Sequence, residues 1–451
     1  MIVMKFGGMS IADAPSVLRV IEIIRSFVKE KPAIVHSAMG KTTRNLLNIA
    51  QLSKSGKSIE AGQILREMVD YHHDLGGAVI RNYASSPVRE LLEKYFREIR
   101  SLFEGVCVLR DLTDRSLDTF LAYGERISTA IMARALSDQG IPATLMDARS
   151  FMITDDRFGQ ARPLEEIAFP KIREQVMPVI EKGEVPVIQG YIGATPHGAT
   201  TTLGFEGSDL TASFIGSALE ARDIKIWKDV PGIMSADPAI VPAARTVPRI
   251  SFEEASELTF FGAQVLHPRS MEPARTWGIP IHVLHSRRPD TPGTEIQERP
   301  EDVKPSVRSV TRKKGLMLMG MKAMRSFAHH ESIRQFFEIL DRERIVVYLF
   351  TASESYMAAA VPGADFAEHV LNDFQKIGDL SLVTGMATVT LVGHSLSTIP
   401  GFLSQVLDAA GEWEVRLVAH RSSPNSLTLM VEESRADDLV RLLHDRFISH
   451  P

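Results

Sequence analysis

A lysine and two glycines directly after the first apolar run have the residue types that bind phosphate. Lys5 precedes Gly7 and Gly8, and Ser10 follows them before a segment with helical periodicity. Adjacent glycines let backbone N–H groups approach phosphate oxygens, and the N-terminus of the next helix adds a partial positive charge. A glycine pair alone is equally typical of a tight turn. The prediction of a phosphate site therefore depends on the lysine at the strand end.

A second polar segment, residues 200–209, also lies between an apolar run and a helix-like stretch. It ends with Ser208 and Asp209, which by position could simply cap the helix and supply an acid to its first turn. Alternatively, Asp209 orients Lys5 or a metal-bound phosphate. A third segment, residues 227–238, contains Asp229 and a Pro-Gly turn signal. It could enclose a nucleotide or form a solvent-facing turn.

The elements that must position these residues are short apolar strands alternating with amphipathic helices. The expected strands are residues 1–6, 33–36, 143–147, 185–189, 224–228 and 279–284, and the clearest expected helices are 14–30, 125–139 and 208–220. Such alternation implies parallel pairing through right-handed crossovers, and so an α/β sandwich. Because ligands of these folds bind at the carboxyl ends of the strands, the chemistry is expected just after each apolar run.

The pattern changes in the C-terminal third of the chain. Four prolines within residues 287–305 indicate a linker. Beyond it, a strand-helix-strand-strand-helix order occurs twice, at residues 315–374 and 387–447. This weak repeat looks like a tandem pair of ACT modules, which are ferredoxin-like units that bind amino acids. The alternative is a ferredoxin-like repeat used only for dimerisation.

The composition is that of a globular protein with several domains. The chain has 451 residues, 44% of them hydrophobic and 24% charged, and a net charge of -5, which gives no basic face for nucleic acid or anionic lipid. No signal peptide or bilayer-spanning run is recognised, so a cytoplasmic protein without a membrane partner is expected. The single cysteine, Cys107, lies in an apolar run and is expected to be buried. The histidine pairs 72–73 and 329–330 lack the spacing of a metal site and are expected on the surface.

A series of motifs in fixed order resembles the signature of the aspartate kinases. The motifs are KFGGMS at residues 5–10, HSAMGKTT at 36–43, YGERIS at 123–128, TTTLGFEGSD at 200–209, WKDVPGIMSADP at 227–238 and FGAQVLHP at 261–268. The resemblance covers essentially the whole chain. It implies an amino-acid-kinase (carbamate-kinase-like) α/β domain, a three-layer sandwich with a mostly parallel central sheet, at residues 1–298. Two ferredoxin-like α+β ACT domains would follow at 306–380 and 381–451.

The resemblance also implies an activity. In such enzymes the γ-phosphoryl group of ATP passes to the side-chain carboxylate of L-aspartate, giving 4-phospho-L-aspartate. This is the first step towards lysine, threonine and methionine. Mg2+ would be carried by the nucleotide, with no metal site of the protein's own. The ACT pair would give feedback control by an end-product amino acid such as lysine or threonine, and would make the chain a homodimer or a larger homo-oligomer.

Roles for individual residues follow from the same resemblance. Lys5 would neutralise the transferring phosphoryl group, and Asp209 would orient Lys5. Ser37 and Thr43 would hold the reacting carboxylate, while Glu125 would pair with the substrate ammonium. The full set is Lys5, Gly7, Gly8, Ser10, Lys228, Asp229, Met234, Asp237 and Gln264 for the nucleotide, Ser37, Thr43, Glu125, Phe205 and Ser208 for the substrate, and Gly401, Phe402, Ser422 and Asn425 for the effector.

Several positions depart from the family pattern. The usual Thr, Arg, Gly, Arg and Lys are replaced in that order by Met9, Phe205, Glu206, Ala239 and Gln264. Three of these changes remove a cation near a bound anion, and each lost charge-assisted contact costs about 1.5–3 kcal/mol. The residues that could compensate are Lys228, which stands where the family usually has an uncharged residue, and Lys41, Arg126 and Arg162.

These departures leave two alternatives to an aspartate kinase. The first is a kinase of the same fold that acts on a different carboxylic amino acid, because Phe205 stands where the substrate's α-carboxylate is normally bound. The second is a catalytically weak amino-acid sensor or regulatory subunit. The presence of Lys5, Glu125 and Asp209 favours an enzyme over a sensor.

Overall fold

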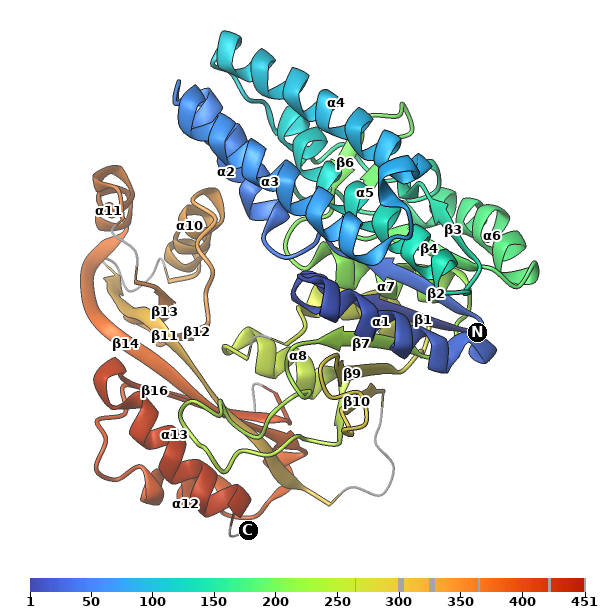
Figure 1. Ribbon diagram of the computed structural model, residues 1–451. Helices are drawn as coiled ribbons and strands as arrows, with labels where there is room; N and C mark the ends of the chain where they lie inside the picture. Colours follow the sequence, from blue (N-terminus) through green and yellow to red (C-terminus); the bar gives the residue numbers. More distant parts are fainter. Residues whose placement is uncertain (264, 299–303, 324–328, 364–365, 421–422, 450–451) are drawn as a thin grey trace. The chain divides into compact units, whose positions relative to one another are not determined.

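The computed structural model divides the chain into two compact units. It describes residues 1–263, 265–298, 304–323, 329–363, 366–420 and 423–449 (Figure 1). The first unit comprises Met1–Ile233, Pro248–Phe252 and Leu266–Arg299, and the second comprises Met234–Val247, Glu253–Val265 and Pro300–Pro451. Among the described helices, none has the length and apolar character needed to cross a membrane.

An eight-stranded sheet forms the centre of the first unit, in the order β3-β4-β2-β1-β7-β9-β10-β8. Its strands are β1 (Ile2–Phe6), β2 (Pro32–His36), β3 (Ala143–Met146), β4 (Val185–Gln189), β7 (Ile224–Lys228), β8 (Arg249–Ser251), β9 (Ile281–His285) and β10 (Thr294–Gln297). All neighbouring pairs are parallel except β9 with β10. The predicted mostly parallel sheet is therefore confirmed, and each of the strands predicted for this part of the chain is present.

Helices cover both faces of this sheet. They are α1 (Ala14–Phe27), α2 (Thr42–Lys54), α3 (Ser58–Val79), α4 (Pro87–Leu109), α5 (Asp114–Asp138), α6 (Glu165–Glu181), α7 (Gly207–Ala218) and α9 (Pro268–Thr276). Side chains of β1 alternate between the faces. Ile2, Met4 and Phe6 join the large core cluster that contains α1 and α5, whereas the methyl of Val3 and the amine of Lys5 meet α7 on the other face. This arrangement is the predicted three-layer sandwich, and it places Lys5 on the α7 face.

Three expectations for the first unit were wrong. The predicted linker contains β10, whose Thr294 hydroxyl accepts the Ile233 N–H at 2.8 Å, so the chain is part of the sheet there. His72 is fully buried, because it faces the interior from the amphipathic helix α3. Cys107 is only half-buried, since it lies in the last turn of α4 beside the exposed Val108.

The second unit contains a six-stranded antiparallel sheet in the order β12-β13-β11-β14-β16-β15. Its elements in chain order are β11 (Ser306–Ala323), α10 (His329–Arg342), β12 (Leu349–Ala352), β13 (Tyr356–Pro362), α11 (Glu368–Gln375), β14 (Gly378–His394), α12 (Phe402–Ala409), β15 (Leu417–His420), β16 (Ser426–Glu432) and α13 (Ala436–His444). The predicted strand-helix-strand-strand-helix repeat is confirmed. Most of α8 (Phe252–Phe260) also belongs to this unit.

Two long strands join the halves of the repeat. The C-terminal part of β11, from Leu316, lies between β13 and the first part of β14. Its N-terminal part, from Ser306 to Lys313, pairs with the last part of β14, which itself pairs with β16. Each half of the repeat therefore takes one strand segment from the other half's sequence.

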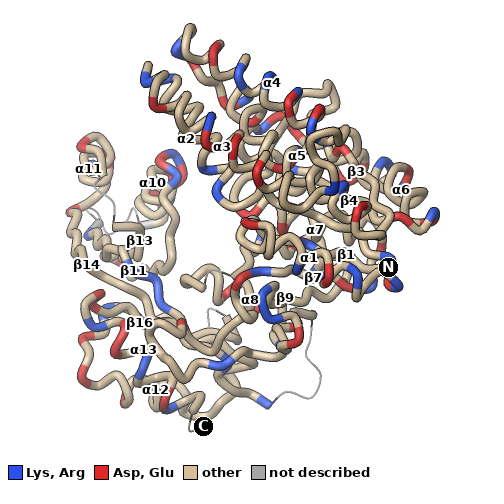
Figure 2. The backbone as a smooth tube through the Cα atoms, in the orientation of Figure 1, with Lys and Arg blue, Asp and Glu red and all other residues tan. Residues whose placement is uncertain are grey.

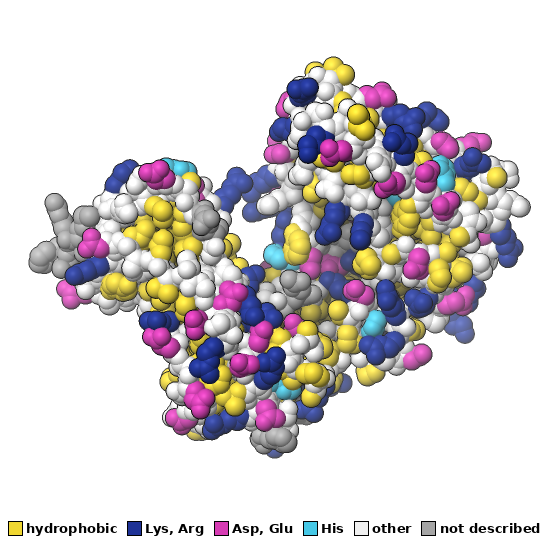
Figure 3. All heavy atoms as spheres, turned by 60° about the vertical axis from the view of Figure 1, so that its left-hand side comes forward, with side chains coloured by type: hydrophobic (Ala, Val, Ile, Leu, Met, Phe, Trp, Pro, Cys, Tyr) yellow, Lys and Arg dark blue, Asp and Glu magenta, His cyan; other side chains and the backbone are white. Residues whose placement is uncertain are grey.

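Charged residues of both signs are interspersed along both units (Figure 2). On the face of the molecule shown in Figure 3, Lys and Arg side chains lie among Asp and Glu, and hydrophobic side chains gather in several small groups between them. Such a surface creates no strong long-range field of one sign.

One buried histidine makes the first unit sensitive to acid. His36, at the end of β2, stacks on Phe6 with ring centroids 5.4 Å apart, and neither ring nitrogen has a hydrogen-bond partner among the described residues. Burial, with a smaller contribution from the Lys5 charge, lowers the pKa of His36 to about 3. Unfolding returns this group to an ordinary pKa near 6.5, so the unfolded chain binds a proton there that the folded chain does not.

We therefore predict that replacing His36 by Leu, which has a similar volume, reduces the loss of stability in acid. Between pH 7 and pH 5 the wild-type free energy of unfolding should fall by about 2 kcal/mol more than that of His36→Leu. Urea-unfolding midpoints of the two proteins at both pH values measure this difference. Parallel pH profiles would show that His36 does not contribute to acid sensitivity.

Candidate active site

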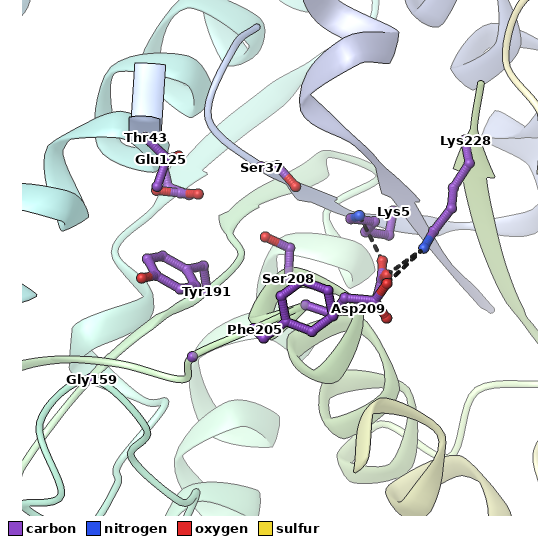
Figure 4. Close-up of a pocket in the computed structure, with 13 residues that line it drawn as sticks. Lys5, Ser37, Thr43, Glu125, Gly159, Tyr191, Phe205, Ser208, Asp209 and Lys228 are labelled. Carbon is purple, nitrogen blue, oxygen red and sulfur yellow. Dashed lines mark ion pairs between the residues drawn. The ribbon is translucent and has the colours of Figure 1, made fainter. Parts of the chain in front are cut away.

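A cavity of about 550 Å³ lies in the first unit at the carboxyl ends of β4, β2, β1 and β7 (Figure 4). Its lining consists of Lys5, Ser37, Thr43, Glu125, Gly159, Tyr191, Gly204, Phe205, Glu206, Gly207, Ser208, Asp209 and Lys228. Eight of these residues are predicted site residues, namely Lys5, Ser37, Thr43, Glu125, Phe205, Ser208, Asp209 and Lys228.

Parallel strand pairing brings the strand-borne members together. Phe6 is in register with His36 on one side and Trp227 on the other, and His36 is in register with Gln189. The ends of the four strands therefore meet at one edge of the sheet. Lys5 and Lys228 lie within the last two residues of β1 and β7, while Ser37 and Tyr191 follow β2 and β4. This is the strand-end position that the alternation of strands and helices predicts.

A buried carboxylate faces two lysines on one side of the cavity. Asp209 Oδ1 lies 2.6 Å from Lys5 Nζ, and its Oδ2 lies 2.9 Å from Lys228 Nζ (Figure 4). Burial alone would raise the pKa of Asp209, but the charges of Lys5 and Lys228 outweigh it and hold the pKa below its ordinary value. Asp209 is thus ionised at neutral pH and fixes both ammonium groups.

The start of α7 differs from the sequence prediction. The helix begins at Gly207, and its N-cap is Glu206, whose backbone is left-handed with φ 53°. Ser208 is therefore the second residue of the helix and not its cap. The possible N-cap role of Ser208 is therefore wrong. The cap lies two residues earlier, at Glu206, whose positive φ no local signal indicates. This shift places the Ser208 side chain and the first turn of α7 on the cavity wall.

Glu125 stands on the opposite side of the cavity, in the middle of α5. The expected helix at residues 125–139 began at Glu125, but Thr113 caps α5 by accepting the Ser116 N–H, so the helix starts eleven residues before Glu125. Glu125 Oε1 accepts the Ala38 N–H at 3.0 Å, and Oε2 has no hydrogen-bond partner among the described residues. Burial raises the pKa of Glu125 to about 8. An unpaired oxygen facing a cavity is well placed to bind a ligand cation.

The loop after β2 is held tightly between neighbours. Ser128 Oγ donates to the Ser37 carbonyl at 2.8 Å, and a Cβ on Gly124 would lie 2.8 Å from the Ala38 Cβ. On the other side, His72 Nε2 lies 3.1 Å from Thr42 Oγ1. Residues of α5 and α3 therefore hold this loop at Ser37, Ala38 and Thr42, next to Thr43.

Other predicted nucleotide residues do not line the cavity. The Gly7 N–H donates to the Trp227 carbonyl at 3.2 Å, and Ser10 is buried with its hydroxyl 2.8 Å from Ser286 Oγ. Asp229 is exposed just beyond β7. Met234 and Asp237 belong to the second unit, and Gln264 lies outside the described residues.

Comparison with known proteins assigns a family to this fold and cavity. The amino acid kinase family matches residues 1–285. Aspartokinase 1 of Arabidopsis thaliana, a chloroplastic protein, is 33% identical over 460 residues, which cover 99% of this chain and 80% of that protein. The chain belongs to the aspartokinases, within the amino acid kinase family.

Solved structures of Escherichia coli aspartokinase III share the fold over 99% of both chains. The complex with aspartate and ADP, in the R-state, has a TM-score of 0.86 at 29% identity. The complex with lysine and aspartate, in the T-state, has a TM-score of 0.84 at 28% identity.

Sequence reasoning missed part of the lining of this aspartokinase cavity. Tyr191 follows a predicted strand but has a left-handed backbone with φ 68°, which no local signal indicates. Gly159 is held in place because its N–H donates to the Asp118 carboxylate at 2.9 and 3.0 Å. Glu206 was noted only as a departure from the family. The signal that could have identified it is its charge, since Lys228 is also a charged residue at a position where the family usually has an uncharged one. The two side chains lie 3.6 Å apart.

The substitution for the usual substrate-binding arginine leaves an aromatic ring at the cavity. Phe205 is 81% exposed and contacts the ring of His267 edge-on, with centroids 6.0 Å apart. His267 caps α9 by accepting the Arg269 N–H, which is a structural role. Of the cations that could compensate, Lys228 lines the cavity, whereas Lys41, Arg126 and Arg162 are not among its lining residues.

The predicted effector residues lie in the second unit. Gly401 has φ 68° and caps α12, and Phe402 is buried against Phe447. Asn425 accepts the Ser395 N–H at 3.1 Å and donates to Glu253 at 3.3 Å. Ser422 lies outside the described residues.

The two glycines near the N-terminus should respond differently to alanine. A Cβ on Gly8 would lie 2.5 Å from the Ala38 carbonyl oxygen, whereas one on Gly7 would make only ordinary contacts at 3.7 Å or more. We predict that Gly8→Ala lowers the free energy of unfolding by about 1–3 kcal/mol and reduces activity, because it separates the two loops. Gly7→Ala, the matched control, should change stability by less than about 1 kcal/mol. Thermal unfolding of both variants tests this, and equal effects would contradict it.

Proposed function

We propose that this aspartokinase transfers the γ-phosphoryl group of ATP to the side-chain carboxylate of L-aspartate. The observation that carries the proposal is the division of the cavity into two sides (Figure 4). Lys5, Lys228 and Asp209 stand on one side, and Thr43 and Glu125 stand on the other, with Ser37 between them. A structurally similar aspartokinase binds aspartate and ADP, which are the ligands that such a division suits.

On the nucleotide side, two lysines and a helix N-terminus would face the phosphates. Lys5 and Lys228 supply positive charge, and the first turn of α7 adds its partial positive charge. Mg2+ carried by the nucleotide would neutralise further charge on the phosphates. The buried Asp209 holds both ammonium groups in place, so little reorganisation is needed at the moment of transfer.

On the substrate side, hydroxyl groups and one acid would orient aspartate. Ser37 and Thr43 would donate hydrogen bonds to the reacting carboxylate, and the unpaired oxygen of Glu125 would accept the substrate ammonium. One carboxylate oxygen would then attack the γ-phosphorus as its bond to the β–γ bridging oxygen breaks. ADP leaves and an acyl phosphate forms, without transfer of a proton. Catalysis is thus positioning plus charge stabilisation.

A second candidate is a different carboxylic amino acid as the phosphoryl acceptor. Among the described lining residues, Lys5 and Lys228 are the only cations, and both lie on the nucleotide side. The exposed ring of Phe205 offers no charge to a substrate α-carboxylate. This observation favours testing a panel of acceptors.

Regulation and assembly are part of the proposal. The second unit would bind an end-product amino acid, and lysine is the first candidate because a relative binds it in the T-state. The predicted division into residues 1–298, 306–380 and 381–451 stays a proposal, as does a homo-oligomer formed through the ACT domains. Inhibition of the reaction by lysine or threonine, and the mass of the assembly in solution, would test these points.

Trapping of the acyl phosphate with hydroxylamine tests the reaction. Purified protein, Mg-ATP and L-aspartate should give a hydroxamate, and Lys5→Ala should lower its rate by about 100-fold or more. Lys29→Ala, a change at an exposed lysine of the same unit, is the matched control and should keep the wild-type rate. Signal with another acid only would move the assignment to the second candidate. Folded protein that gives no signal with any acid would refute the kinase.

Glu125 should make aspartate binding depend on pH. With its pKa near 8, the side chain is mostly protonated below that pH and must lose a proton to pair with an ammonium group. We therefore expect the KM for aspartate to fall as pH rises from 6.5 to 8, by up to about tenfold per pH unit. In Glu125→Gln the KM should be higher and nearly independent of pH. The KM for ATP serves as the internal control, and an unchanged aspartate profile in the variant would contradict the role of Glu125.

A further inference from the structure

Four charged groups form a chain along the nucleotide side of the cavity. Lys5 contacts Asp209 at 2.6 Å, Asp209 contacts Lys228 at 2.9 Å, and Lys228 lies 3.6 Å from Glu206 Oε1. The last two residues are both departures from the family pattern, in which an uncharged residue and a glycine usually stand at these positions. The two departures therefore meet in space as a pair of opposite charges.

Charge balance explains why the two departures occur together. Asp209 and Lys5 alone form a neutral pair, and a second lysine would leave a net positive charge in a cavity wall that is largely shielded from water. Glu206 restores neutrality. Burial would lower the pKa of Lys228, but Asp209 and Glu206 together hold it above its ordinary value. Lys228 is therefore charged before any ligand arrives.

Glu206 is anchored independently of the lysine. Its Oε2 accepts the backbone N–H of His267, so one carboxylate oxygen is tied to the protein and the other faces Lys228. The backbone of Lys228 is fixed as well, because its carbonyl accepts the Ser286 N–H at 2.8 Å and the Ser286 hydroxyl at 3.0 Å. Only the flexible lysine stem remains to move between Glu206 and a neighbouring anion.

We propose that Glu206 is a positioning residue for the nucleotide, which holds Lys228 at the cavity wall until the phosphates arrive and limits how tightly they bind. This inference rests on the proposed nucleotide site. A polyphosphate draws Lys228 towards itself, and the longer Lys228–Glu206 contact weakens first. The Glu206 carboxylate then faces the phosphates with a negative charge and weakens their binding, which favours release of ADP.

Binding of Mg-ADP, measured by calorimetry without aspartate, tests the inference separately from the reaction. Glu206→Gln keeps an oxygen for the His267 N–H but removes the charge, so it should bind Mg-ADP roughly three- to tenfold more tightly at low salt. The gain should shrink as salt rises, because the interaction is electrostatic. The kcat should fall if ADP release then limits turnover, together with a lower KM for ATP. Unchanged or weaker Mg-ADP binding would overturn the proposal.

Two further variants make the test independent of folding defects. Glu206→Gly removes the carboxylate and places the residue best suited to φ 53° at this position, and it should also bind Mg-ADP more tightly than the wild type. Glu220→Gln, just beyond the other end of α7, neutralises an exposed carboxylate that pairs with Arg173 and should leave Mg-ADP binding unchanged.

A double-mutant cycle connects the effect to Lys228. The effect of Glu206→Gln on Mg-ADP affinity is measured once in the wild type and once in Lys228→Met. If Glu206 acts through the lysine, the two fold-changes should differ at least threefold. Equal factors in both backgrounds would show that Glu206 acts alone, and the proposal would fail. Loss of hydroxamate formation with these binding effects intact would instead refute the proposed acceptor reaction and leave the inference standing.

Discussion

The electrostatics of the cavity depend on one buried carboxylate that two lysines neutralise. Asp209 lies in the first turn of a fully buried helix, where an isolated charge would cost several kcal/mol, so its ionised state requires Lys5 and Lys228. Those lysines come from the ends of two neighbouring parallel strands. The register of β1 with β7 and the start of α7 therefore bring the carboxylate and both ammonium groups together. The two lysines that neutralise the buried acid of α7 also supply the positive charge of a site for polyanions.

Much of this architecture could be predicted from the sequence for a physical reason. Strands buried on both faces, such as β1 and β4, are rich in apolar residues, with a single polar residue near the end of each, and this pattern is typical of a parallel sheet. Short elements gave no such signal. Thr294–Gln297 alternates buried and half-exposed residues over only four positions, and prolines nearby suggested a linker instead. The first half of α5 was not among the expected helices, although Thr113 is a recognisable N-cap.

The cavity was predictable to the extent that it is made by strand ends and by motifs. Lys5, Asp209 and Lys228 were found in this way, since residues that follow parallel strands share one edge. Contacts between distant segments were not predictable. Glu206, whose backbone is left-handed, caps α7, and its side chain accepts the backbone N–H of His267, which lies far away in the sequence. Tyr191 is also left-handed, and its N–H donates to Thr211 Oγ1 in another element. His72 was misplaced for the same reason, because its partner Thr42 lies in another element.

The exchange of strand segments between β11 and β14 has a consequence for how the C-terminal repeat can be used by evolution. Neither half is a module that can be excised or shuffled, because a cut between them leaves one long strand without the neighbour that covers its edge. The repeat must be inherited, duplicated or lost as a whole. Sequence change in one half is therefore constrained by the other, and the two halves can diverge in ligand preference only at positions away from the strands they share.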